Sequence, residues 1–511
     1  MTSPTRITHL IGHRSWEGVS ERHGEVFNPA TGEVTGQVDF ASAELVGEIV
    51  ESAAAAGAEW GRASLAARVQ VLFRFRSLLE ANKQRIAELI TAEHGKVVSD
   101  ALGEVTRGLE VVEFACGIPH LLKGGFSENV STSVDTYSIM QPLGVVGVIS
   151  PFNFPAMVPM WFVPIAIACG NAVVIKPSEK DPSVVNAVAE LWQEAGLPDG
   201  VMNVVHGDKE AVDALLTHPL VKAISFVGST PIAQYVYEVG AKHGKRVQAL
   251  GGAKNHMLVL PDADLDLAAD AAVNAGFGSA GERCMAISVV VAVDSIADEL
   301  VARIRTRMGQ LTTGDGRTGC DMGPIVTAAA RDRIVGYVQA GLDAGAELVV
   351  DGRIEWHDGA AEGGGEGTFT GVEEGFFVGP TMFDRVTPDM SIYTDEIFGP
   401  VLSVVRVASY DEGLALINAS RYGNGTAIFT NDGGAARRFQ NEVEVGMVGI
   451  NVPIPVPMAY FSFGGWKASL FGDSHAHGIE GVHFYTRTKA VTARWLDPSH
   501  GGLNLGFPQN K

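Results

Sequence analysis

Cys284 is the strongest candidate for chemistry in this chain, and it lies in the run Gly281-Glu282-Arg283-Cys284-Met285. A cysteine thiolate can add to an aldehyde and, after loss of a hydride, form a thioester. Hydrolysis of such a thioester needs a base that is positioned to activate water. The remaining cysteines lie far apart and show no C-x-x-C spacing, so we expect small buried hydrophobic residues and neither a metal site nor a disulfide framework. They are Cys116, Cys169 and Cys320.

Three further polar segments follow predicted strands, where a doubly wound sheet faces its ligands. Asn153 follows the first strand, in a loop flanked by prolines that restrict its backbone. Lys176 and Glu179 follow the second strand, and an ammonium with a carboxylate suits ribose hydroxyls. Ser229 follows the third strand, and Pro231 suits the first turn of a helix whose N-terminus would favour a pyrophosphate. Each segment taken alone also suits a purely structural loop.

The elements that must position these residues form two α/β series behind a helical layer. Apolar residues recur at helical spacing from about residue 41 to residue 122. From residue 144, short β-branched runs alternate with helical stretches, which predicts a doubly wound parallel sheet. A second series of strands and helices runs from residue 256 to about residue 451. The predicted strands include 145–149, 172–175, 201–205, 223–227, 257–260 and 401–405.

Three segments lie outside these two series. Residues 132–140 and 483–495 are rich in β-formers and fit strands outside the main sheets. The glycine-rich run 359–375 predicts a surface loop.

Length, charge and the distribution of apolar residues limit the classes of protein and partner that fit this chain. The 511 residues exceed the size at which one hydrophobic core keeps growing, so at least two domains are expected. A formal net charge of -21 disfavours nucleic acid or an anionic membrane as the main partner. The first 24 residues have no apolar stretch of signal-peptide length, and the chain has no run of about 18 apolar residues. We therefore expect a cytoplasmic protein.

Together with Glu396-Ile397-Phe398-Gly399-Pro400, these motifs occur in the order found in the aldehyde dehydrogenase superfamily, which the chain resembles over nearly its whole length. Within it, the chain is similar to the CoA-acylating methylmalonate-semialdehyde dehydrogenases, also called malonate-semialdehyde dehydrogenases. The specific marks are the runs 107–113, 155–161, 248–256 and 281–285.

The resemblance implies an α/β, aldehyde dehydrogenase-like fold with three parts. Residues 1–123 and 142–250 would form a doubly wound NAD-binding domain, and 251–455 an α/β catalytic domain. Residues 124–141 and 481–497 would form a small β oligomerisation element. The resemblance also implies a homotetramer, built as a dimer of dimers.

The resemblance also assigns the candidate site residues. Cys284 would be the nucleophile, and Asn153 together with the Cys284 backbone N–H would hold the oxyanion. Arg107 and Arg283 would bind the substrate carboxylate, because guanidinium groups suit that planar anion. Independently of the resemblance, the adjacent charge of Arg283 suggests the hypothesis that it also lowers the pKa of the thiol. The cofactor set would be Ser150, Phe152, Lys176, Glu179, Lys180, Ser229, Gly251, Glu396 and Phe398, with Glu396 on the nicotinamide ribose.

Two positions, 179 and 249, bear on the cofactor and on the fate of the acyl group. Glu179 would repel a 2′-phosphate, which favours NAD over NADP. Where hydrolytic members of the superfamily place a glutamate before Leu-Gly-Gly, this chain has Ala249. The resemblance therefore implies that the Cys284 thioacyl group loses carbon dioxide and passes to CoA as a co-substrate.

The expected reaction is NAD-dependent oxidation of methylmalonate semialdehyde to propionyl-CoA, or of malonate semialdehyde to acetyl-CoA. The sequence leaves open which semialdehyde is preferred and whether the pathway is valine or inositol breakdown. Two other activities also stay open. One is a hydrolytic semialdehyde dehydrogenase that uses another base, and the other is an inactive binding or structural protein on this fold.

Overall fold

The first sheet is doubly wound, as predicted, and its five central strands are parallel. The computed structural model describes residues 4–353, 368–370 and 375–495. The sheet changes winding direction between β8 and β11, and ligands bind beside the carboxyl ends of strands at such a switch point. Its central strands, in spatial order, are β10 (Met202–Val204), β9 (Ala172–Lys176), β8 (Val145–Ile149), β11 (Val221–Val227) and β12 (Arg246–Leu250).

Short antiparallel strands extend both edges of this sheet. At one edge, β24 (Leu470–Phe471) returns from far along the chain and pairs with β12. At the other edge, β2 (Leu10–Ile11) pairs with β10, and β3 (Arg14–Ser15) pairs with β2. Sequence reasoning did not predict β24, because a two-residue strand carries no periodic signal.

Helices cover both faces of the first sheet, and the expected helical layer is confirmed. Along β8, Val146 and Val148 face one helical layer, while Val145 and Ile149 face the other. The first layer comprises α2 (Leu65–His94), α3 (Val98–Cys116), α5 (Met157–Ala168) and α6 (Ser183–Glu194), with the short α4 (Ile118–Leu121) beside it. The second comprises α1 (Ala43–Trp60), α7 (Lys209–Thr217) and α8 (Thr230–Lys242).

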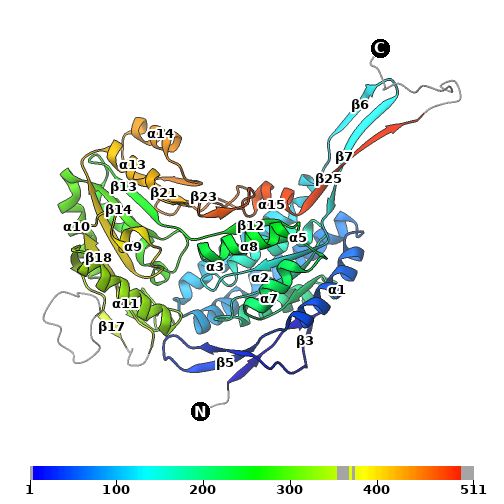
Figure 1. Ribbon diagram of the computed structural model, residues 1–511, viewed down its shortest axis with the longest axis horizontal. Coiled ribbons are helices and arrows are strands. Elements are labelled where there is room, and N and C mark those ends of the chain that lie inside the picture. The colour runs from blue at the N-terminus through cyan, green and yellow to red at the C-terminus, as the bar shows by residue number, and fades with distance from the viewer. Residues whose placement is uncertain (1–3, 354–367, 371–374, 496–511) are drawn as a thin grey trace.

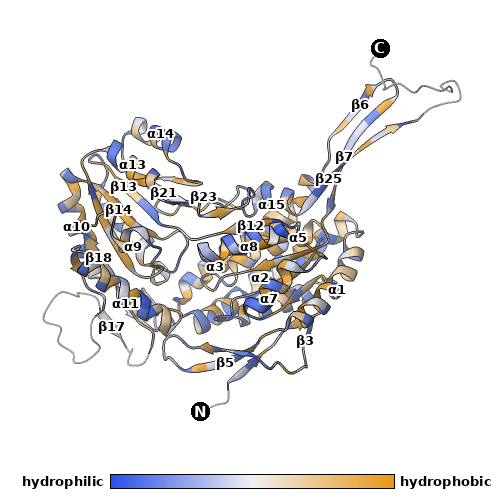
Figure 2. Cartoon of the chain, viewed as in Figure 1, coloured by the Kyte–Doolittle hydropathy of each residue, from blue (hydrophilic) through white to orange (hydrophobic). Residues whose placement is uncertain are grey.

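The second α/β series builds a seven-stranded sheet in which only β16 is antiparallel. In spatial order its strands are β16 (Glu347–Val350), β18 (Thr381–Asp384), β19 (Val401–Val407), β14 (Ile287–Val293), β13 (Asn255–Val259), β21 (Gly425–Phe429) and β22 (Met447–Ile450). Its helices are α9 (Leu265–Phe277), α10 (Asp294–Met308), α11 (Ala328–Asp343), α12 (Ser391–Thr394), α13 (Tyr410–Ala419) and α14 (Gly433–Glu442). Strands of both sheets are mainly hydrophobic, whereas outer helices such as α10 and α14 carry many hydrophilic residues (Figure 2).

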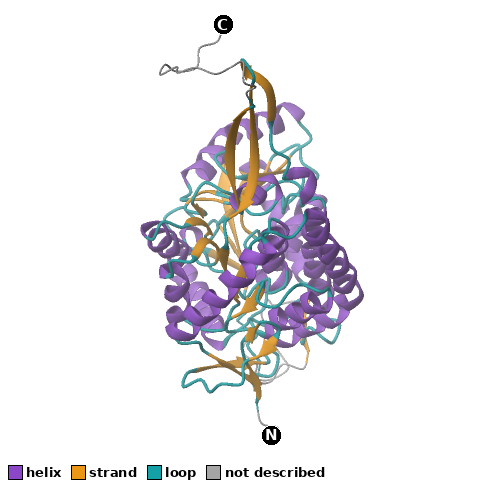
Figure 3. Cartoon of the chain, turned by 90° about the vertical axis from the view of Figure 1, so that its right-hand side faces the viewer, coloured by secondary structure: helices purple, strands orange, loops and turns teal. Residues whose placement is uncertain are grey.

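A three-stranded antiparallel sheet projects from the body of the molecule (Figures 1 and 3). It consists of β6 (Phe126–Ser131), β7 (Val134–Pro142) and β25 (Thr486–Arg494). The two predicted outlying strands are therefore present and pair with each other. The second begins later than predicted, because His483 and Phe484 end the helix α15 (Gly478–Phe484). Residues 496 and 497 lie outside the described residues.

Small sheets complete the fold. One contains β1 (Thr5–Ile7), β5 (Val34–Asp39) and β4 (His23–Phe27), and another pairs β20 (Tyr422–Gly423) with β23 (Trp466–Lys467). The prediction of a loop over 359–375 is wrong at Thr368–Thr370, which forms β17 and pairs with β15 (Thr312–Gly314). Threonine and phenylalanine favour strands, and their pairing overrides the glycine-rich surroundings. Most of that run lies outside the described residues. In the described part of the chain, no helix is long and apolar enough to cross a membrane.

Candidate active site

Cys284 lies in a strained loop between α9 and β14. The preceding residues Ser279, Ala280 and Gly281 all have left-handed backbones, with φ of 52°, 51° and 73°. Such conformations cost free energy for residues other than glycine and tend to gather at functional sites. A Cβ on Gly281 would lie 2.2 Å from the carbonyl oxygen of Gly399, so only glycine permits this close approach. The loop that carries Cys284 is thereby packed against the loop that carries Glu396 and Phe398.

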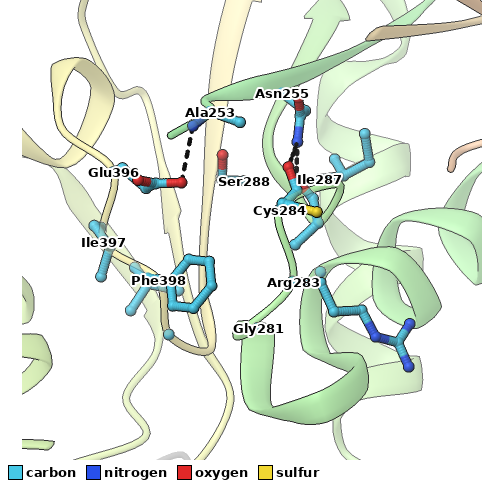
Figure 4. A pocket seen from close by; sticks show the side chains of 14 residues that line it. Ala253, Asn255, Gly281, Arg283, Cys284, Ile287, Ser288, Glu396, Ile397 and Phe398 are labelled. Atoms are coloured by element: carbon cyan, nitrogen blue, oxygen red, sulfur yellow. Dashed lines mark hydrogen bonds between the residues drawn. The ribbon is translucent and has the colours of Figure 1, made fainter. Parts of the chain in front are cut away.

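These two loops line a pocket that brings Cys284 together with Glu396 and Phe398 (Figure 4). The space between its lining residues, open solvent included, is about 350 Å³. Glu396 accepts a hydrogen bond of 2.8 Å from the backbone N–H of Ala253. Burial raises the pKa of Glu396 to about 7. The predicted residues Cys284, Glu396 and Phe398 are therefore neighbours in space.

Opposing effects act on the Cys284 thiol. Burial, with a smaller contribution from the Glu396 carboxylate, raises its pKa to about 12. The backbone N–H groups of Cys284 and Met285 act in the opposite direction, as does the charge of Arg283. The expected effect of Arg283 therefore has the predicted sign, but burial outweighs it. In the free protein the thiol is predominantly neutral at physiological pH.

Asn153 is buried beside the Cys284 loop. Its Nδ2 donates a hydrogen bond of 3.0 Å to the carbonyl oxygen of Glu282, two residues before Cys284. A side-chain amide has two N–H donors, so one remains for a substrate oxygen. The contact joins the loop after β8 to the loop before β14. It places the predicted oxyanion donor next to the predicted nucleophile.

A buried ion pair supports the loop that carries Asn153, and the sequence did not reveal it. Lys96 Nζ lies 2.8 Å from Glu104 Oε2 and donates a hydrogen bond of 2.6 Å to the carbonyl oxygen of Asn153. Glu104 Oε1 accepts hydrogen bonds from the backbone N–H groups of Ala156 and Met157, at 2.8 and 3.1 Å. Helix α5 has no side-chain cap of its own. Glu104, on α3, therefore caps α5 from outside and satisfies its free N–H groups.

Two asparagines hold the backbone of Cys284 and were not predicted as site residues. Asn255 Nδ2 donates to the carbonyl oxygen of Cys284 at 2.9 Å, and Asn424 Nδ2 donates to the same oxygen at 3.1 Å. Asn255 belongs to the run 248–256 that marked the family resemblance, but nothing local in the sequence links it to Asn424. Figure 4 shows Asn255 directed at the Cys284 backbone.

The predicted residues for the adenine ribose and pyrophosphate lie at carboxyl ends of the first sheet. Ser150 is buried, and its hydroxyl has no hydrogen-bond partner within the described residues. Lys176 Nζ lies 3.6 Å from Glu179 and donates to the carbonyl oxygen of Gly207. Ser229 precedes α8 and is exposed, and its side chain makes no capping hydrogen bond. These groups offer hydrogen-bond donors suited to a dinucleotide, although Ser150 and Lys176 are buried and only Ser229 is exposed.

The remaining predicted cofactor residues flank this edge. The Lys180 ammonium lies 4.2 Å from the ring centroid of Phe152, which is within range of a cation–π contact. Phe152 also meets Phe398 edge to face, at a centroid distance of 5.8 Å. Gly251 follows β12, and its backbone N–H donates to Ser469. Phe152 and Phe398 therefore connect the groups of the first sheet with those of the second.

Both predicted carboxylate-binding arginines pair with acidic residues of α3. Arg283 lies 2.6 Å from Asp100, and Arg107 lies 2.6 Å from Glu110. The side chain of Arg283 is directed away from Glu396 and Phe398 (Figure 4). Both guanidinium groups therefore already have an anionic partner in the protein, and of the two only Arg283 lines the pocket with Cys284.

A second buried carboxyl group lies near the nucleophile. Glu282 is buried, and burial raises its pKa to about 8. Its Oε2 lies 4.0 Å from Nε2 of the buried His94. His94 in turn stacks on Phe152 at a centroid distance of 5.9 Å. Sequence reasoning assigned no role to either residue.

Comparison with known proteins gives consistent matches over almost the whole chain. The model of the aldehyde dehydrogenase family matches residues 16–491. The malonate-semialdehyde dehydrogenase of Pseudomonas aeruginosa is 57% identical, over 95% of this chain and 96% of that protein. The crystal structure of the methylmalonate-semialdehyde dehydrogenase from Oceanimonas doudoroffii has a TM-score of 0.92 and 52% identity, covering 97% of this chain and 99% of that one.

A second solved structure contains a cofactor. It is a protein from Sinorhizobium meliloti described as a methylmalonate-semialdehyde dehydrogenase and complexed with NAD. It has a TM-score of 0.92 and 51% identity, and the match covers 97% of this chain and 99% of that one.

Replacing Lys96 tests whether its buried ion pair with Glu104 stabilises the loop that carries Asn153. Lys96→Met should destabilise the protein by about 3–5 kcal/mol, because it leaves the Glu104 carboxylate buried without its partner. Urea unfolding followed by tryptophan fluorescence measures the change. Lys209→Met is the control, since Lys209 pairs with Asp213 on the exposed face of α7. Equal shifts in the two unfolding midpoints would contradict a special role for Lys96.

Proposed function

The chain belongs to the aldehyde dehydrogenase family, and from that premise we propose that it oxidises malonate or methylmalonate semialdehyde with NAD and transfers the acyl group to CoA. The products are acetyl-CoA or propionyl-CoA, together with carbon dioxide. The names of its relatives and the NAD-complexed neighbour support the substrate class and the cofactor. The transfer to CoA rests on the site itself.

The residue at position 249, an alanine, is the observation on which the proposed transfer to CoA rests. It occupies the position of the water-activating glutamate in hydrolytic members of the family, and in β12 it is a fully buried methyl group. Its neighbour Gln248 is buried and donates a hydrogen bond of 2.7 Å to Ser225 Oγ. Neither residue can deprotonate water. A thiol needs less help than water, because it ionises far more readily near neutral pH.

The reaction begins at Cys284. Its thiolate adds to the aldehyde carbon, and the oxygen that becomes negative is held by the second N–H of Asn153 and by the Cys284 backbone N–H. One such donor is typically worth about 10²–10³ in rate. NAD, when bound, accepts the hydride. The Asn153 amide is already oriented by its bond to Glu282, so it needs little reorganisation at that moment.

Loss of carbon dioxide precedes release of the acyl group. The thioacyl group carries a carboxylate β to its carbonyl, and cleavage of the carbon–carbon bond leaves an enolate on the same oxygen. Asn153 and the Cys284 N–H therefore stabilise both negative oxygens. Protonation of the enolate gives an acetyl or propionyl thioester. The CoA thiolate then attacks this carbonyl, and the Cys284 thiolate leaves.

We assign the first sheet to the cofactor. Residues 1–123 and 142–250 form the NAD-binding domain, and residues 251–455 form the catalytic domain. Lys176 and Glu179 hold the adenine ribose, and the Glu179 carboxylate repels a 2′-phosphate. Ser229 binds the pyrophosphate at the start of α8. Glu396 holds the nicotinamide ribose beside Phe398. The unpartnered hydroxyl of Ser150 supports this assignment.

The substrate carboxylate binds between Arg107 and Arg283. Both guanidinium groups already pair with carboxylates of α3, so the substrate carboxylate has to share or displace these partners. Arg107 also donates to the carbonyl oxygen of Pro457 at 3.0 Å, which fixes its orientation. A neutral aldehyde would gain nothing from either residue.

A hydrolytic activity is the second candidate, and two buried carboxyl groups favour it. Glu396 and Glu282 have pKa values raised to about 7 and about 8. A general base works best when its pKa lies near the operating pH. Glu396 also lines the pocket with Cys284. If either residue activates water, the product is a free acid.

We propose that the projecting sheet, within residues 124–141 and 481–497, assembles the protein into a homotetramer. Apolar side chains on this sheet are exposed, including Phe126 at 67% and Ile139 at 37%. Light scattering should give the mass of four chains, and Phe126→Glu should shift it to smaller species. Phe73→Glu, at an exposed site on α2, should leave it unchanged. A monomeric wild-type protein would overturn the proposal.

Arg107→Leu tests recognition of the substrate carboxylate. The variant should raise KM for malonate semialdehyde by at least tenfold and change KM for propanal little, because only the first substrate loses a charge-assisted bond. Steady-state NADH formation measures both. Arg76→Leu is the control, since Arg76, on α2, pairs with Glu113 on α3, the helix that carries Arg107. Equal effects on the two aldehydes would indicate a structural role.

The fate of the acyl group distinguishes the two activities. With NAD and semialdehyde but no CoA, the enzyme should release a burst of about one NADH per site and then slow sharply, because no base activates water. Added CoA should restore linear turnover and yield an acyl-CoA. Cys284→Ala should give no burst. Linear NADH formation without CoA, accompanied by free acid, would show that the enzyme is hydrolytic. No NADH at all would indicate an inactive protein.

A further inference from the structure

The carbonyl oxygen of Cys284 accepts hydrogen bonds from two side-chain amides, which fill both of its lone pairs. Asn255 Nδ2 and Asn424 Nδ2 converge on this one oxygen at 2.9 and 3.1 Å. They come from β13 and from the turn before β21, and 169 residues separate them in the chain. Buried amides that converge in this way polarise the group that they bind.

Both asparagines are themselves fixed. Asn255 Oδ1 accepts a hydrogen bond of 3.1 Å from the backbone N–H of Gly425, and its Nδ2 also donates to Ala286 O at 3.0 Å. Asn424 Nδ2 contacts Met285 Sδ at 3.0 Å. These partners determine which side-chain atom of Asn255 is nitrogen and which is oxygen. The two amides cannot turn away from the Cys284 carbonyl without breaking other bonds.

The polarised carbonyl shares its peptide group with the N–H of Met285. Electron density drawn toward the oxygen leaves that N–H more positive, and hydrogen-bond chains of this kind strengthen each other. The Met285 N–H is one of two backbone donors that lower the pKa of the Cys284 thiol. The asparagines therefore act on the sulfur through one peptide bond.

We propose that Asn255 and Asn424 are positioning residues that hold and polarise the Cys284–Met285 peptide, so that its N–H stabilises the Cys284 thiolate. The proposal rests on the proposed role of Cys284 as the nucleophile. It supplies an activating group in a site where position 249 has no carboxylate.

Few charged groups face the sulfur, which makes this contribution important. Glu396, from the loop before β19, disfavours the thiolate, and the neighbouring Arg283 favours it. Arg283 is paired with Asp100 at 2.6 Å, so part of its charge is already compensated. Backbone donors therefore add to the stabilisation from Arg283 and oppose the effect of Glu396.

The test compares the thiol pKa between variants, because below the pKa the rate of alkylation is proportional to the thiolate fraction. The rate at which iodoacetamide alkylates Cys284 is followed against pH by peptide mass spectrometry, in wild type, Asn424→Leu and the double variant Asn255→Ala/Asn424→Leu. Each lost amide should raise the apparent pKa by about 0.1–0.7, which corresponds to a loss of about 10–30% of one charge-assisted bond. The double variant should show the larger rise, and its alkylation at neutral pH should slow accordingly.

Asn418→Leu is the matched control. Asn418 Nδ2 donates to Glu442 O at 2.9 Å, and its Oδ1 accepts from Glu444 N at 2.8 Å, so it joins backbone segments in the same domain. Its loss should leave the thiol pKa unchanged. A purely structural role for Asn255 and Asn424 would change the fraction of folded protein but not the pKa of the folded part.

An unchanged or lowered thiol pKa in the folded variants would overturn the proposal. If the double variant does not fold, Asn424→Leu decides alone, because Asn255 still holds the loop in that variant. Alkylation needs neither aldehyde nor CoA. A wild-type protein that makes free acid would therefore defeat the proposed acyl transfer and leave this inference standing.

Discussion

The buried pair of Lys96 and Glu104 is the contact on which the geometry of the site depends. Two charges removed from water must satisfy each other and their remaining hydrogen-bonding capacity. Here that capacity goes to the carbonyl oxygen of Asn153 and to the first N–H groups of α5. Helix α5 is apolar along its whole length and has no side-chain cap. The Asn153 amide can face the Cys284 loop because its own backbone is anchored from beneath.

The two sheets meet the site with opposite ends. In the first sheet, the candidate groups follow β8, β9 and β11, at carboxyl ends. In the second, Cys284 and Glu396 precede β14 and β19, at amino ends. The loops that lead into β14 and β19 place their site residues before the strands begin. Ser279, Ala280 and Phe398 in these loops have left-handed backbones. The packing of Gly281 on Gly399 holds that strain in place.

Periodic features of the chain were predictable, and contacts between distant residues were not. The β-branched run of β8 and the helical spacing of α2 are local, so pattern alone placed them. The family resemblance predicted that Glu396 and Phe398 belong to the same site as Cys284, and all three residues line one pocket. The pairing of Arg283 with Asp100, and the convergence of Asn255 with Asn424, depend on tertiary packing across more than 160 residues. No local pattern encodes them.

The buried acids near Cys284 bear on which nucleophile can complete the reaction. At neutral pH a carboxyl group with a pKa of about 8, such as Glu282, is mostly protonated, so only a minor ionised fraction can act as a base. Glu396 is only partly ionised at that pH, and it already accepts the N–H of Ala253. Water needs a base to attack a thioester, whereas a thiol arrives partly ionised. A raised pKa makes each carboxylate a stronger base but leaves less of it ionised at neutral pH, so hydrolysis depends on that ionised fraction, whereas attack by a thiolate does not.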